Sequence, residues 1–328
     1  MKKVLFATSA LVMTAGVAAA EVAVSGDGRM GVVYDGNDMQ FSSRARVKFT
    51  LTGESDAGLS FGAAFRVDQE NYSANEYRSA ARGSAGAVWI SGTYGKLSMG
   101  DVVSASEAAI GDLYEIGYTS GTFAGDVEEI SYLTGDGENL DQGPSILYEY
   151  SINQISFYAS ASDGVDTDLG SLTPGANNWA GDDPDTNLPS DKTAYSLAAK
   201  YDAGNWWAAL GYAKHDEASE LSLGAEAKFN QFSVKGIYVD YSDRFVGGAE
   251  MEYTAGLAAA YQADAVTVKG FWRQDKFDLG AGNGNEKFDS FGIGADYDLG
   301  GGAVLAGGIV DTDYLDDTVA DLGVKFSF

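Results

Sequence analysis

The stretch "SRARVKFTL", residues 43–51, decides which secondary structure this chain can form. Polar and apolar residues alternate along it, and successive side chains of a β-strand point to opposite faces. One face therefore carries Arg44, Arg46 and Lys48, and the other carries Val47 and Phe49. The alternation predicts a strand with one polar and one apolar face.

Similar runs recur along the chain. The run "MEYTAGLAAAY", residues 251–261, places Met251, Tyr253 and Leu257 on one face and Thr254 on the other. The chain has only four prolines, all between residues 144 and 189, so the strands are free of the residue that interrupts a hydrogen-bonded sheet. We predict sixteen strands: 22–34, 41–51, 59–68, 86–92, 97–101, 145–151, 155–161, 193–201, 206–214, 220–229, 232–239, 250–261, 266–273, 287–297, 302–310 and 318–328.

Composition excludes several classes of protein. The net charge is −27, which opposes binding to nucleic acid because phosphate contacts need clustered Lys and Arg. There is no cysteine, so the fold uses no disulfide. Residues 1–20 have a basic start, an apolar run and Ala18-Ala19-Ala20, which is typical of a secretory signal peptide. No later run of eighteen apolar residues predicts a membrane helix. An exported β-protein remains, either soluble or a membrane barrel.

The connections favour the membrane barrel. Short connections follow aromatic residues, as after Tyr201 and Phe229, whereas residues 162–192, 240–249 and 274–287 read as long polar loops. Outer-membrane barrels have short turns at one end, long loops at the other and girdles of aromatic residues. An even number of strands lets the first and last pair, and sixteen strands enclose a water-filled lumen. We therefore expect an all-β transmembrane antiparallel barrel over residues 21–328.

The stretch "SASEAAIGDLYEIG", residues 104–117, breaks the alternation. Ser104 followed by Glu107 resembles a helix capping box, and three acids, Glu107, Asp112 and Glu115, follow in close succession. On the predicted strands before it, four bases share the polar faces: Arg29, Arg44, Arg46 and Arg66.

The sequence resembles the general porins of α-proteobacterial outer membranes, the Rhodobacter-type family. The resemblance is carried by "EVAVSGDGRMGVVYDG" at residues 21–36, "GKLSMGDVVSASEAAIGDLYEIGYT" at 95–119 and "VADLGVKFSF" at 319–328. It implies a trimeric sixteen-stranded barrel in the Gram-negative outer membrane, in contact with lipid and lipopolysaccharide, that passes small hydrophilic solutes and ions.

The resemblance also implies roles for residues 104–117, which interrupt the alternation, and for the four arginines. Residues 102–144 stand where the family has its inward-folded third long loop, which constricts the pore. The acids Glu107, Asp112 and Glu115 would then face Arg29, Arg44, Arg46 and Arg66 across the constriction. The balance of charge predicts a mild preference for cations.

Other motifs point to alternatives. "GDGRMG", residues 26–31, matches a dinucleotide-binding pattern, but strand continues on both sides of it. "GLSFG", residues 58–62, matches a nucleophile elbow, and with the single histidine, His215, it leaves a barrel lipase as an alternative. A soluble acidic β-protein is the other alternative. No cofactor is required, although Ca²⁺ near Glu107, Asp112 and Glu115 is a hypothesis, since that ion takes six to eight oxygen ligands.

Overall fold

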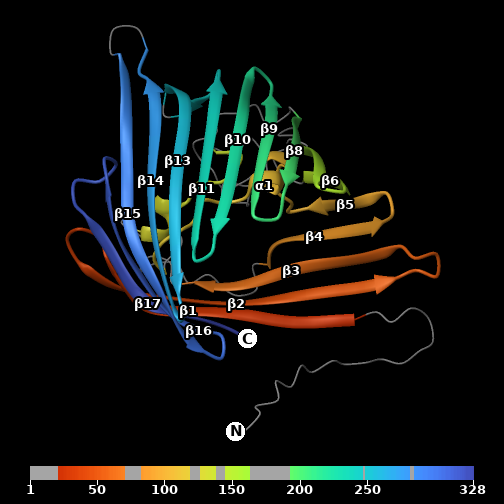
Figure 1. The fold of residues 1–328 in the computed structure, drawn as a ribbon, viewed down its shortest axis with the longest axis horizontal. Coiled ribbons are helices and arrows are strands. Elements are labelled where there is room, and N and C mark those ends of the chain that lie inside the picture. The colour runs from red at the N-terminus through yellow and green to blue at the C-terminus, as the bar shows by residue number, and fades with distance from the viewer. Residues whose placement is uncertain are drawn as a thin grey trace, which may run out of the picture.

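The computed structural model describes residues 21–70, 83–118, 126–137, 145–162, 193–246, 248–280 and 284–328. Its strands form one antiparallel sheet in which β1 pairs with both β2 and β17, so the sheet closes on itself (Figure 1). The strands are β1 (Glu21–Tyr34), β2 (Met39–Glu54), β3 (Ser60–Glu70), β4 (Gly83–Gly92), β5 (Gly95–Gly100), β6 (Ser145–Ile152), β7 (Ile155–Ser162), β8 (Ala194–Asp202), β9 (Trp206–His215), β10 (Ala218–Phe229), β11 (Phe232–Ser242), β12 (Phe245–Val246), β13 (Ala249–Ala263), β14 (Val266–Asp278), β15 (Asn285–Gly300), β16 (Ala303–Thr312) and β17 (Val319–Ser327).

The barrel wall has sixteen strands, as the sequence predicts. The additional element β12 has only two residues and pairs only with β13, while β11 pairs with β13 directly. The predicted loops were too long at two places. In the predicted loop 240–249, strands β11 and β12 occupy most of residues 240–246. In the predicted loop 274–287, β14 continues to Asp278 and β15 already begins at Asn285.

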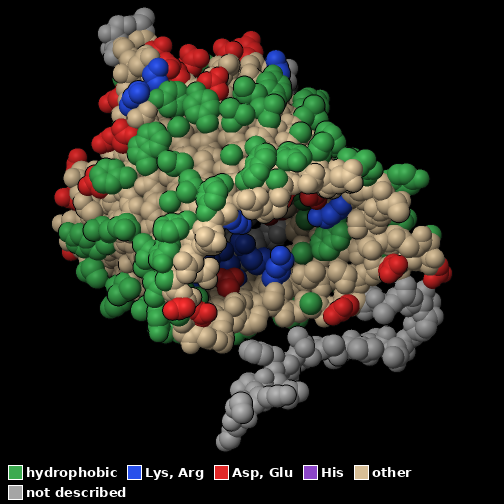
Figure 2. All heavy atoms as spheres, viewed as in Figure 1, with side chains coloured by type: hydrophobic (Ala, Val, Ile, Leu, Met, Phe, Trp, Pro, Cys, Tyr) green, Lys and Arg blue, Asp and Glu red, His purple; other side chains and the backbone are tan. Residues whose placement is uncertain are grey.

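The two faces of the sheet differ as the alternation predicts. Strand β9, "WWAALGYAKH", alternates between exposed and buried residues along its whole length. Large apolar side chains are exposed on the outer face, for example Leu197 at 63 %, Leu257 at 52 % and Ile293 at 56 %. Figure 2 shows hydrophobic side chains spread over the outer surface and Lys and Arg side chains gathered in a hollow of the molecule. Such exposure would be costly in water, but it suits a wall that faces lipid on its outside.

One facing prediction is wrong. Alternation places Met251 and Leu257 of β13 on the same face, but Met251 is only 1 % exposed, whereas Leu257 lies on the exposed outer face. The pairing of β13 with β14 shifts between Met251 and Tyr253, where a bulge adds a residue to β13. An extra residue reverses the direction of every side chain beyond it, so Met251 turns to the inner face.

Tight turns depend on residues that tolerate a positive φ angle. Asn153 (φ 54°), Asn230 (φ 54°) and Asp264 (φ 51°) follow the ends of β6, β10 and β13. Asn and Asp adopt this left-handed conformation more readily than other residues with a side chain. Asp216 (φ 51°) makes an equally tight turn between β9 and β10, at the end of the barrel where the sequence suggested long loops.

The described part of the chain has two short helices, α1 (Ala105–Ile110) and α2 (Val127–Ser131), between β5 and β6. Over the same residues, no helix has the length and hydropathy to cross a membrane. The C-terminal residue closes the sheet, because the Phe328 N–H donates to the Gly26 carbonyl at 2.8 Å.

Candidate pore constriction

Helix α1 begins where the sequence predicts. The Glu107 N–H donates to the Ser104 hydroxyl at 3.2 Å, which is the serine half of a capping box. The helix ends at Gly111, whose φ of 64° favours glycine and whose N–H donates to the Glu107 carbonyl at 2.7 Å. A cap at each end fixes a helix that is too short to be stable by itself.

Helix α1 is seated on the polar face of strands β8 to β11. The Ala105 N–H donates to Ser196 Oγ at 2.7 Å, and Lys235 Nζ donates to the Ile110 carbonyl at 2.8 Å. Gly211 lies so close to the helix that a Cβ there would come within 2.3 Å of Ser106 Oγ. These contacts hold both ends of α1 against one wall.

Helix α2 is seated on a different part of the same face. Asp126 caps it, since its carboxylate accepts the N–H groups of Glu128 and Glu129 at 3.1 and 3.2 Å. Just beyond the helix, Arg273 on β14 donates to the Tyr132 carbonyl at 2.8 Å. The segment between the helices is held by β17, where Lys325 Nζ donates to the Gly117 carbonyl at 3.1 Å.

The four predicted arginines lie on three neighbouring strands. Arg29 on β1 stands opposite Arg44 on β2, and two residues along the register Arg46 stands opposite Asp27. Arg66 on β3 stands opposite Lys48. Arg44 is buried, with its guanidinium 3.5 Å from the Asp27 carboxylate. The polar face of β1 to β3 therefore carries the row of bases that alternation indicates.

Arg29 makes a direct contact between this row and the helical segment. Its guanidinium donates to the Tyr118 carbonyl at 2.9 Å and forms an ion pair with Glu128. Glu128 was not among the acids singled out from the sequence. The signal that indicates it is Asp126 followed by Glu129, which is the same kind of helix start as Ser104 followed by Glu107.

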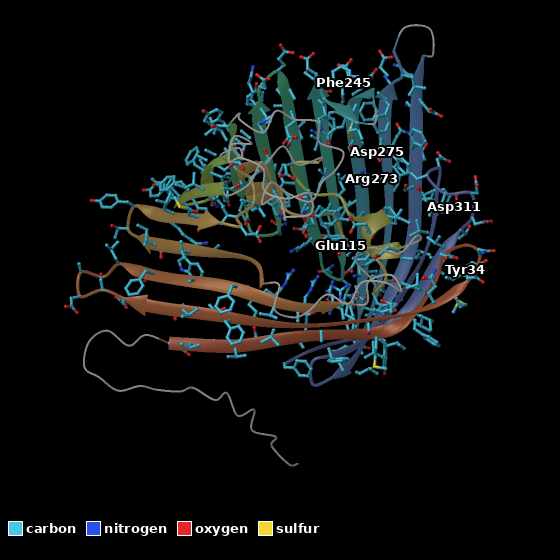
Figure 3. All side chains as sticks on the ribbon, turned by 180° about the vertical axis from the view of Figure 1, so that it is seen from behind. Tyr34, Glu115, Phe245, Arg273, Asp275 and Asp311 are labelled. Carbon is cyan, nitrogen blue, oxygen red and sulfur yellow. The ribbon has the colours of Figure 1, made fainter. Side chains whose placement is uncertain are left out.

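Of the three predicted acids, Glu115 is the one that lines the same pocket as Arg29. Both line a pocket of about 210 Å³ together with Glu128, Glu129 and Tyr132. Burial, and then the neighbouring Glu128 carboxylate, raise the pKa of Glu115 to about 8. Figure 3 shows Glu115 within the barrel.

Glu107 and Asp112 do not line this pocket. Their charges nevertheless act at its edge, because burial and then Glu107 and Asp112 raise the pKa of Tyr132, which lines the pocket, above its ordinary value. The structure therefore brings Glu115 and Arg29 together and leaves the other two acids beside α1.

A second polar cluster on the inner face was missed from the sequence. Lys200 and Lys235 place their ammonium groups 4.0 and 5.1 Å from the centre of the Trp207 ring. The Trp207 N–H donates to Glu226 at 2.6 Å, and Lys228 lies 3.3 Å from the same carboxylate. Alternation places these residues on one face but does not show that four strands bring them together.

The alternative motifs gain no support from the fold. "GDGRMG" lies wholly within β1, without the strand-to-helix turn that dinucleotide binding needs. Ser60 begins β3 and His215 ends β9, and these strands are not neighbours in the sheet. The described residues include no group of three or more His, Cys, Asp or Glu that could hold a metal ion, so the calcium hypothesis has no ligand cluster among them.

Comparison with known families supplies the deciding observation. The family model described as Gram-negative porin matches residues 7–317. The chain belongs to this family. This porin is 40 % identical over 332 residues to a porin of Rhodobacter capsulatus, an alignment that covers 94 % of the chain and all of the relative. It is 30 % identical to a porin of Fuscovulum blasticum, with the same coverage.

Solved structures agree with the family. A refined porin structure matches with a TM-score of 0.68 and 35 % identity, over 94 % of this porin and all of that chain. A mutant of Rh. blastica porin matches with a TM-score of 0.64 and 25 % identity over the same shares. The chain is thus an outer-membrane diffusion porin. Its family indicates a channel rather than an enzyme, and the alternative of a soluble β-protein is excluded.

Proposed function

We propose that this porin filters small hydrophilic solutes and ions by size and charge at its third long loop, residues 102–144, whose described residues contact the arginine row of β1 to β3 through Arg29. The ion pair between Arg29 and Glu128, beside the pocket that holds Glu115, carries this proposal. Opposed charges across a narrow passage order water and polar solutes and disfavour apolar ones.

In the proposed filter, the acids and the bases have opposite effects on permeating ions. Glu107 and Asp112, together with Glu128, attract cations and repel anions, and Glu115 does so above its raised pKa of about 8. Arg29, Arg44, Arg46 and Arg66 do the reverse. The net charge of −27 supports a mild preference for cations. Each charge matters more in the pore than on an open surface, because the effective dielectric constant is lower and every ion must pass it.

Family membership and the sequence support the remaining roles that we propose. The porin assembles as a homotrimer in outer-membrane lipid and lipopolysaccharide, passes solutes down their gradients and catalyses no reaction. Residues 1–20 lie outside the described residues and act as the signal peptide, and residues 21–328 form the barrel. No cofactor is needed, and Ca²⁺ bound near Glu107, Asp112 and Glu115 remains a hypothesis.

Reversal potentials of single channels in a planar bilayer test the charge filter. In a salt gradient, replacing Glu107, Asp112 and Glu115 with their amides shifts the zero-current potential toward anion preference. Neutralising Arg44 and Arg46 shifts it the opposite way. Both shifts shrink in 1 M salt, where the Debye length is about 3 Å. Unchanged potentials in all variants would contradict the proposed filter, although a conducting barrel would remain.

A further inference from the structure

A second pocket lies between α2 and the inner face of β14 to β16. It has a volume of about 260 Å³, which suits a small solute and is below the usual size of drug-binding pockets. It shares one lining residue, Glu129, with the pocket that Arg29 and Glu115 line. The lining residues are Asp126, Glu129, Ile130, Arg273, Ser290, Thr312, Tyr314 and Leu315.

The charge of the pocket is set by its acids. Arg273 is the only base among the described lining residues, and its Nε lies 3.1 Å from the carboxylate of Asp275, which is 0 % exposed. Figure 3 shows these two side chains together inside the barrel. Because Asp275 compensates the guanidinium, the carboxylates of Asp126 and Glu129 leave the pocket with net negative charge.

The remaining lining is apolar and partly aromatic. Ile130 from α2 and Leu315 from the connection after β16 supply aliphatic surface. The ring of Tyr314 is stacked on Phe288, with centroids 4.7 Å apart, and its hydroxyl donates to Asp275 at 2.8 Å. Tyr314 is nevertheless 49 % exposed, so these two contacts fix the ring while leaving much of its surface accessible.

Two wall hydroxyls have partners within the wall, and Thr312 Oγ1 also accepts the Tyr314 N–H at 3.3 Å. Ser290 and Thr312 are buried and bond to each other at 2.6 Å. The described lining of the pocket therefore offers mainly carboxylates, an aromatic ring and aliphatic surface.

We propose that this pocket binds small solutes that combine an apolar body with a protonated amine, and so holds them on the pore wall beside α2. The ammonium group would lie near Glu129 and Asp126, and the apolar body against Ile130, Leu315 and the Tyr314 ring. An aromatic face also attracts a cation directly. The inference rests on the proposed function only in requiring that solutes reach the inner face of the barrel.

Cyclohexylamine, which is protonated at neutral pH, is a suitable probe for the full-length channel in a planar bilayer. We expect it to produce concentration-dependent interruptions of the single-channel current. Its neutral and anionic counterparts, cyclohexanol and cyclohexanecarboxylate, should produce none at the same concentration. Glu129→Gln and Tyr314→Ala should each raise the half-blocking concentration about threefold or more, which corresponds to the loss of one cation contact.

Matched variants separate the pocket from the general field of the pore. Asp317→Asn removes the same charge from the exposed connection that carries Tyr314, outside the pocket lining, and should leave the block unchanged. Tyr314→Phe keeps the ring and should retain more binding than Tyr314→Ala. Equal effects of Glu129→Gln and Asp317→Asn, or equal block by all three probes, would overturn the proposal.

A second readout does not depend on current. Saturation-transfer NMR of the detergent-solubilised protein should show cyclohexylamine bound to the wild type and more weakly to Glu129→Gln. If the channel conducts with the selectivity proposed above but neither method detects the amine, the pocket proposal fails and the charge filter stands. Amine binding without charge-dependent conduction would reject the filter alone.

Discussion

At the scale of single residues, Glu115 gives the pore a titration near neutral pH. Burial, and then the Glu128 carboxylate, raise its pKa to about 8, so it is protonated below that pH and ionised above it. Raising the pH from 6 to 9 should therefore add negative charge beside Arg29 and shift the zero-current potential toward cations. Glu115→Gln should flatten this pH dependence. Glu217→Gln, at the exposed turn between β9 and β10, should leave it intact.

Arg29 should influence selectivity more than another base on the same face. It contacts both Glu128 and the Tyr118 carbonyl, whereas Lys48 is exposed. Arg29→Gln leaves the poorly exposed Glu128 carboxylate without its cation, which should increase cation preference. Lys48→Gln should do so less, because solvent screens an exposed charge. Reversal potentials of the two variants in the same salt gradient make the comparison, and equal shifts would mean that the ion pair has no special effect.

At the scale of elements, the position of α1 depends on glycines in the wall. A Cβ at Gly211 would lie 2.3 Å from Ser106 Oγ, so Gly211→Val should push the helix away from the wall. Such overpacking typically costs about 1–3 kcal/mol, and the displaced helix should narrow the passage. Gly236→Val is the control, because its nearest atoms would lie at 3.7 Å. We expect reduced single-channel conductance for the first variant and normal conductance for the second.

The sequence predicts the helices and strands well where they depend on interactions between residues close together in the chain. Alternation locates the sixteen wall strands, and Ser104 with Glu107 locates the start of α1. The orientation of Met251 depends on the bulge in β13, which alternation cannot reveal. The pairing of Arg29 with Glu128 is also non-local, since it joins residues 99 positions apart. Contacts of that kind depend on how the barrel closes and where the segment folds back.

At the scale of the whole molecule, the barrel has an apolar outer face because its solvent there is lipid. Leu257 is 52 % exposed on that face, and Leu257→Arg near the middle of the bilayer should lower stability by about 2–4 kcal/mol. The effect falls with distance from the midplane, so it also reports the depth of the residue.

The control for this substitution must lie on the inner face with room for a long side chain. Thr254 is unsuitable, since it is 1 % exposed and donates to Asp275 at 2.8 Å. Thr267 on β14 is better, because it is only partly buried and stands opposite Asp296, which an arginine could pair with. Thr267→Arg should therefore cost less than Val268→Arg, the adjacent position on the exposed face at nearly the same depth, when both are compared by urea unfolding in lipid vesicles. Equal costs would mean that the two faces do not meet different solvents, and the barrel could not then separate lipid from a water-filled lumen.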